Sequence, residues 1–137
     1  MTPKLFRDLL IAYLILSIFS VMINQVFSAL IPEDILHARH DYYENLSTLS
    51  KISILLFSLV AFLGGIVSVI GLYLFRPWAP RLAVIITILT LFIWPIQGIN
   101  VATGYSTVLS SLSTTIWGAI LAIVYFSPLK ERFSANR

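Results

Sequence analysis

Three long stretches without a charged side chain constrain what this chain can fold into. No Asp, Glu, Lys or Arg occurs in residues 9–32, 52–75 or 82–129. A helix needs about 20 apolar residues to cross the hydrocarbon core of a bilayer, and each of the first two stretches fits one crossing. The third stretch is about twice as long. It contains the turn-forming segment QGINVATGYS at 97–106, which divides it into two crossings.

These stretches predict an all-α membrane protein, a bundle of four transmembrane helices in one integral membrane domain. The expected helices cover about residues 7–30, 50–75, 80–98 and 107–127 of the 137. The composition agrees, because 58% of the residues are apolar and 11% are charged, whereas soluble domains average about 45–50% and 25%. The first run is too long for the apolar region of a cleaved signal peptide, so we expect it to remain as a helix.

Basic residues are distributed unevenly among the expected connecting segments. Lys and Arg in short loops favour the cytoplasmic side of a membrane, and only Arg39 and Lys51 lie near the loop at 31–49. We therefore expect that loop and the neutral 97–106 turn outside, and both termini in the cytoplasm. Topology then accounts for the positive charge, so the expected partner is the lipid bilayer and not nucleic acid. The seven basic residues on the cytoplasmic side are Lys4, Arg7, Arg76, Arg81, Lys130, Arg132 and Arg137.

The turn between the second and third expected helices has the sequence RPWAPR. Pro77 disfavours helix at the preceding residue, and Pro80 suits the first turn of a new helix. Trp78 suits the headgroup level of a membrane. We interpret Arg76 and Arg81 as topology anchors, with a phosphate or anionic-lipid site as the alternative.

The segment around this turn resembles small bacterial inner-membrane proteins of four helices, in which RPWAR-like turns join the middle two. The resemblance covers residues 72–83 and the helix layout, and Pro80 stands where those proteins often have a polar or basic residue. It implies the four-helix fold and a multi-pass protein of a bacterial inner membrane. It implies no activity and no site residues. The residues that carry it are Leu72, Leu74, Arg76, Pro77, Trp78, Ala79, Arg81, Leu82 and Ala83.

Small side chains line one face of two of the expected helices. Helices inside lipid associate through close packing of small residues and through hydrogen bonds. Either face could pack within the chain, or could dock onto another membrane protein or a second copy. The candidate helix-packing residues are Ala61, Gly64, Gly65 and Ser68 in the second helix, and Ser111, Thr114 and Gly118 in the fourth.

Four amide side chains lie at the outer ends of the first and third expected helices. They are Asn24, Gln25, Gln97 and Asn100. They could line an outward-facing polar crevice, or they could satisfy helix ends near water. No ionisable residue is expected at mid-membrane, which argues against a proton-coupled pump.

The first outer loop is predicted to form a short amphipathic helix on the membrane surface, from residue 33 to about residue 46. The spacing of Glu33, His37, His40 and Glu44 places them on one helical face. His and carboxylate side chains at such spacings can hold a divalent metal. A surface helix with its polar face in water has the same pattern. No firm metal motif is matched, so we expect a solvated face and no metal or cofactor.

Catalytic signatures are missing from the sequence. There is no cysteine, no glycine-rich phosphate loop and no nucleophile elbow, so we do not expect an enzyme. The sequence predicts a small polytopic inner-membrane protein that acts as an interaction or accessory subunit. The alternative is a small oligomeric transporter or binding protein with the outward-facing polar crevice.

Overall fold

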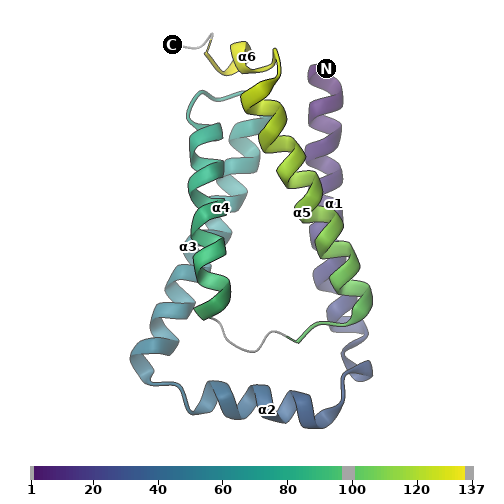
Figure 1. The fold of residues 1–137 in the computed structure, drawn as a ribbon, viewed down its shortest axis with the longest axis vertical. Helices are drawn as coiled ribbons and strands as arrows, with labels where there is room; N and C mark the ends of the chain where they lie inside the picture. The colour runs from purple at the N-terminus through teal and green to yellow at the C-terminus, as the bar shows by residue number, and fades with distance from the viewer. Residues whose placement is uncertain (1, 97–100, 135–137) are drawn as a thin grey trace.

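The computed structural model describes residues 2–96 and 101–134, and these residues form helices and connecting turns without a strand. Three of the helices are long and apolar enough to cross a membrane, and a fourth contains the shorter apolar stretch Ala79–Ile93. The all-helical architecture and the helices of a membrane protein are thus as expected. The elements in chain order are α1 (Pro3–Val26), the 3-10 turn η1 (Ser28–Leu30), α2 (Glu33–Glu44), α3 (Thr48–Tyr73), α4 (Ala79–Ile96), α5 (Gly104–Phe126) and α6 (Lys130–Ser134) (Figure 1).

The long helices lie where the uncharged stretches predict them, and their ends are shifted by side-chain caps and turns. α1 begins at Pro3, and the Thr2 hydroxyl accepts a hydrogen bond from the Leu5 N–H at 3.4 Å. It ends at Val26 instead of near residue 30, because a separate 3-10 turn follows. α5 begins inside the expected turn, because the Thr103 hydroxyl caps it by accepting the Ser106 N–H at 3.3 Å.

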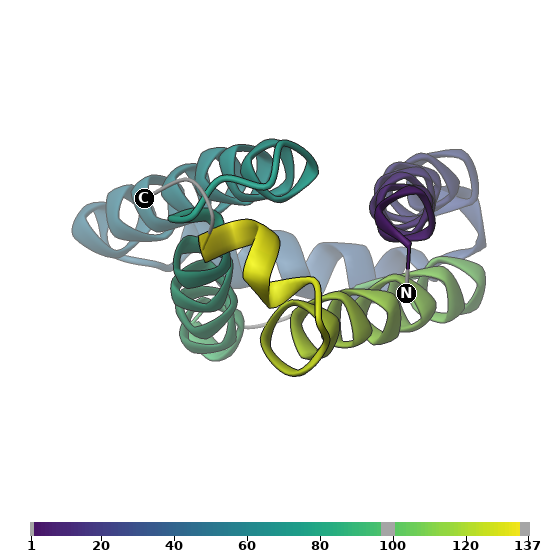
Figure 2. The same ribbon diagram turned by 90° about the horizontal axis from the view of Figure 1, so that it is seen from above.

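The helices α1, α3, α4 and α5, called the four long helices below, form two antiparallel pairs, α1 with α5 and α3 with α4 (Figures 1 and 2). The pairs meet at one end, the closed end, which carries the start of α1, the α3–α4 turn and α6. They diverge toward the open end, where α2 crosses from one pair to the other (Figure 1). An evenly packed four-helix bundle is therefore not confirmed.

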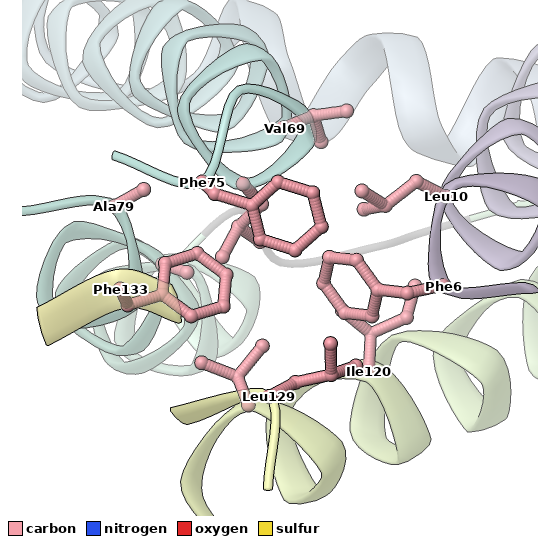
Figure 3. Packing of buried hydrophobic residues seen from close by; sticks show 11 residues of the cluster. Phe6, Leu10, Val69, Phe75, Ala79, Ile120, Leu129 and Phe133 are labelled. Carbon is pink, nitrogen blue, oxygen red and sulfur yellow. The ribbon is translucent and has the colours of Figure 1, made fainter. Parts of the chain in front are cut away.

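The buried core lies at the closed end, where the two pairs meet. The ring of Phe6 from α1 lies 5.7 Å from that of Phe75 after α3 and 6.2 Å from that of Phe133 in α6 (Figure 3). The rings of Phe75 and Phe133 are 5.3 Å apart. These aromatic contacts hold the two pairs and α6 together. The other members of the cluster are Leu10, Val69, Leu72, Ala79, Ala83, Ile120, Val124 and Leu129.

Away from this cluster, the long helices expose most of their large apolar side chains. Leu55 is 71% exposed, Val26 72% and Phe126 91%. In the apolar windows of α1, α3 and α5, only 11% to 17% of the residues are buried. Soluble monomers rarely expose contiguous apolar patches larger than a few hundred Å². The surface of the helix pairs is therefore suited to lipid.

Charged residues in the described part of the chain lie at the two ends of the helix pairs. The closed end carries six basic and two acidic residues, a net charge of +4. The open end carries two basic and four acidic residues, a net charge of −2 with neutral histidines. The middle of the pairs holds no Asp, Glu, Lys or Arg.

Candidate functional site

A cleft of about 420 Å³ lies between the two helix pairs. Ligand sites in proteins typically measure about 300–1,000 Å³, so the cleft has the size of a small-molecule site. All four long helices contribute to its lining. Apolar groups come from Val21, Ala61, Ile86 and Leu91, and the hydroxyl side chains are those of Ser17, Ser20, Thr87, Thr90, Ser110, Ser113 and Thr114.

Two aromatic side chains line the cleft toward the core. The Tyr13 ring of α1 stacks on the Trp117 ring of α5, with centroids 4.8 Å apart. The indole N–H of Trp117 donates to the Thr87 hydroxyl of α4 at 2.9 Å. This hydrogen bond joins one helix pair to the other, so it fixes the spacing of the cleft walls at this depth.

Most hydroxyl groups in the cleft donate to the carbonyl one turn earlier in their own helix. Thr90 donates to the Ile86 carbonyl and Thr114 to the Ser110 carbonyl, both at 2.8 Å, and Ser110 donates to the Thr107 carbonyl at 3.0 Å. A hydroxyl has one donor and two acceptor lone pairs. These oxygens therefore offer acceptors, and no donors, to whatever occupies the cleft.

Serines join α1 to α5 along one seam. The hydroxyls of Ser17 and Ser113 lie 2.6 Å apart, and Ser20 donates to the Ser106 carbonyl at 2.9 Å. Ser20, Ser106 and Ser113 are buried. Sequence reasoning missed this seam. The sequence pattern that could have indicated it is a pair of serines on each helix. Ser106 and Ser113 are seven residues apart on α5, and they face Ser17 and Ser20, which are three residues apart on α1.

The amide residues of the expected crevice do not line this cleft in the part of the chain that the structure describes. The Asn24 side chain accepts the Thr103 N–H at 3.0 Å and thereby ties the end of α1 to the start of α5. Gln25 is exposed. Gln97 and Asn100 lie outside the described residues. Asn24 therefore satisfies a helix end, which is the second of the two expected roles. The crevice formed by all four residues stays a prediction.

The small residues of α3 are divided between the α3–α4 contact and the cleft. A methyl group at Gly64 would overlap the Ile86 side chain, so α3 and α4 approach closely there. Ser68 is fully buried and donates to the Gly64 carbonyl at 2.7 Å. Ala61 and Gly65 line the cleft, and a methyl group at Gly65 would meet nothing within 4 Å.

Two of the three small residues of α5 lie away from the other helices, and the third borders the cleft. Ser111 and Gly118 are exposed, and a methyl group at Gly118 would meet nothing within 4 Å. Thr114 borders the cleft. The Ser111 hydroxyl donates to the Thr107 carbonyl at 2.9 Å, within its own helix. This outward face of α5 is thus open for contact with lipid or with another helix.

The α3–α4 turn closes with a pair of hydrogen bonds typical of helix C-termini. The Phe75 N–H donates to the Leu72 carbonyl at 3.1 Å and the Arg76 N–H to the Gly71 carbonyl at 2.9 Å. This motif usually places glycine where Phe75 stands, and Phe75 accordingly has a φ of 53°. Gly71 is needed because a methyl group there would lie 2.7 Å from the Trp78 ring.

Arg7 ties α1 to this turn. Its guanidinium donates to the Tyr73 carbonyl at 3.3 Å, at the C-terminus of α3, where a helix dipole favours a cation. The same group lies 4.8 Å from the centre of the Tyr73 ring. A smaller hollow of about 230 Å³ lies beside the turn, between Arg81 and Lys130.

The histidine face of α2 points away from the rest of the chain. His40 and Glu44 are 3.1 Å apart, and both side chains are exposed. Glu33 and His37 are also exposed. Among the described residues, no three His, Asp or Glu side chains are grouped as a metal site would require.

Comparison of the chain with protein-family models, with curated proteins and with solved structures finds no match.

Proposed function

We propose that the chain is a small multi-pass protein of a bacterial inner membrane, with four crossings and both termini in the cytoplasm. α4 is the shortest crossing, and its 18 residues span about 27 Å at 1.5 Å per residue, close to the roughly 30 Å of the hydrocarbon core. The net positive charge of the closed end supports a cytoplasmic position for that end. The RPWA-x-R segment supports a place among small four-helix proteins of this membrane.

We further propose that it acts as an interaction or accessory subunit without catalytic chemistry of its own. The observation that carries this proposal is the outward face of α5, where Ser111 and Gly118 are exposed. The comparable stripe on α3 is partly covered, because Gly64 packs against Ile86 of α4. The α5 stripe has no such neighbour among the described residues.

An uncovered small-residue stripe is suited to a helix of another subunit. Lipid tails and leucine side chains are equally apolar, so helices associate in a membrane through close backbone approach and hydrogen bonds. Gly118 permits that approach, because no side chain holds a neighbouring helix away. We therefore expect a partner helix, from a second copy or from another membrane protein, to lie along Ser111 and Gly118.

Single-cysteine crosslinking in native membranes tests this contact, because the chain has no cysteine of its own. We expect Ser111→Cys and Gly118→Cys to form crosslinked products in high yield. Leu112→Cys is the matched control, since its side chain points about 100° away from that of Ser111. The mass of the product distinguishes a second copy from a different protein. Only monomer at all three positions, or equal yields, would contradict the proposed contact.

A binding protein is the second candidate, because the cleft has the volume of a ligand site. The lining of the cleft supports this candidate, and Asn24 and Gln25 are not part of that lining. The two functions are compatible, since Ser111 and Gly118 lie outside the lining of the cleft and only Thr114 of the stripe borders it.

A further inference from the structure

The lining of the cleft restricts the charge of a ligand. Among the residues that the structure describes, no Asp, Glu, Lys, Arg or His lines it. A charged group that leaves water for an apolar site needs a partner of opposite charge or a set of hydrogen bonds, and without them the cost is high. The cleft is therefore unsuited to an ion or an ionised headgroup.

The hydroxyl oxygens restrict the polar part of a ligand. Thr90 and Thr114, from α4 and α5, use their protons within their own helices. Their remaining lone pairs can accept a hydrogen bond and cannot donate one. A ligand group held between these helices must therefore supply an O–H or N–H donor.

The other lining groups favour an apolar chain. Ala61 and Gly65 of α3, Ile86 and Leu91 of α4, and Val21 of α1 offer hydrocarbon or open space. The cleft lies along the middle turns of the long helices, at the depth of lipid tails if the helices cross the membrane. A ligand can therefore reach it from the bilayer.

We propose that the cleft binds an uncharged amphiphile, a molecule with a long apolar chain and a hydroxyl or amide donor. The apolar chain lies against α3 and α4, and the donor binds to the threonine oxygens. The inference goes beyond the proposed helix contact and does not depend on it, because Ser111 and Gly118 lie outside the cleft lining. Free long-chain alcohols and diacylglycerol share this chemistry.

Quenching of Trp117 fluorescence by a bromine-terminated long-chain alcohol tests the proposal. The three tryptophans are reduced to one by Trp78→Phe and Trp94→Phe, so that the signal comes from the cleft. In lipid nanodiscs we expect saturable quenching by the alcohol and only weak quenching by the matching carboxylate at a pH where it is ionised. Displacement of the probe by diacylglycerol or by an unbrominated alcohol identifies the source of the natural ligand.

Gly65→Leu fills the cleft and is expected to weaken binding of the probe by about tenfold or more. Gly118→Leu adds the same side chain outside the cleft and is expected to leave binding unchanged. This pair also separates the two proposals, because Gly118→Leu disturbs only the helix contact. Circular dichroism checks that both variants fold.

Thr90→Val keeps the shape of the lining and removes one acceptor, so it remains informative if Gly65→Leu fails to fold. We expect it to weaken binding of the alcohol several-fold, because one hydrogen bond is lost. Quenching by the matching bromoalkane, which has no hydroxyl group, should stay unchanged. Quenching that rises without saturation, or that is equal in Gly65→Leu and the parent, would mean partition into the bilayer only. Equal affinity for the alcohol and the ionised carboxylate would also overturn the proposal.

Discussion

Phe75 has a backbone conformation that glycine usually adopts at the end of a helix. Its φ of 53° is the only positive value of a non-glycine residue in the described chain. A bulky side chain in this left-handed region is disfavoured by about 1–2 kcal/mol. The Phe75 ring is nevertheless buried between those of Phe6 and Phe133. Its packing therefore stabilises the tight turn between α3 and α4.

We expect Phe75→Gly to be more stable than Phe75→Ala, by about 1 kcal/mol. Both changes remove the ring and cost about 3–5 kcal/mol, but only glycine also relieves the left-handed strain. Denaturant unfolding of the two variants in the same detergent measures the difference. A more stable alanine variant would show that the turn is not strained at this position.

Two adjacent glycines in α3 are expected to respond differently to the same substitution. Gly64→Leu should destabilise the protein by about 1–3 kcal/mol, because the new side chain overlaps Ile86 and forces α3 away from α4. Gly65→Leu should have a smaller effect, since the side chain enters the cleft. Leu56→Ala is the control for an exposed position. An equal loss of stability in Gly64→Leu and Gly65→Leu would contradict the observation that Gly64 packs against α4 whereas Gly65 faces the cleft.

At the scale of elements, the serine seam explains why α1 pairs with α5 although they are far apart in the sequence. Ser17 and Ser113 share a hydrogen bond of 2.6 Å. Interhelical hydrogen bonds in membranes contribute about 0.6 kcal/mol on average. A double-mutant cycle of Ser17→Ala and Ser113→Ala should give a coupling energy of about this size. If the losses in unfolding free energy of the two single variants add up to that of the double variant, the hydrogen bond does not stabilise the pair.

The helix α2 covers Glu33–Glu44, close to the predicted 33–46, and its place on the membrane surface stays a prediction. We expect it to bind zinc more weakly than the micromolar range, because its four candidate ligands are exposed and only His40 and Glu44 are paired. Calorimetric titration of the purified protein with zinc measures the affinity. His37→Ala/His40→Ala is the control. A tighter site that the double variant loses would identify α2 as a metal site.

The sequence predicts individual elements better than their arrangement, for a physical reason. The length of an uncharged stretch and the position of a capping residue such as Thr103 are local, so they indicate where helices lie. The choice of neighbour is not local. It depends on Ser17 meeting Ser113 and on Gly64 meeting Ile86, from segments that are distant in the chain or on opposite sides of a turn.

The candidate site could not be predicted from the sequence for the same reason. The cleft exists because the two helix pairs meet at the closed end and diverge from it, and its lining comes from four helices. Its hydroxyl residues resemble the many other serines and threonines of the chain. Of the residues singled out by sequence, Ala61, Gly65 and Thr114 do line the cleft, but they were chosen as packing residues.

For the molecule as a whole, the proposed topology depends on α4 as the fourth helix that crosses the membrane. If α3, α4 and α5 all cross the membrane, Asn45 before α3 and Glu131 in α6 lie on opposite sides. If α4 does not cross, they lie on the same side. Both residues are exposed, and the absence of native cysteine permits single-cysteine variants at each.

Labelling with a membrane-impermeant maleimide, before and after lysis of the inner membrane, is the most direct measurement. We predict that Asn45→Cys and Ala102→Cys are labelled before lysis, and that Glu131→Cys is labelled only after it. Labelling of Asn45→Cys and Glu131→Cys under the same condition would contradict four crossings. Labelling of Glu131→Cys alone before lysis would reverse the proposed orientation.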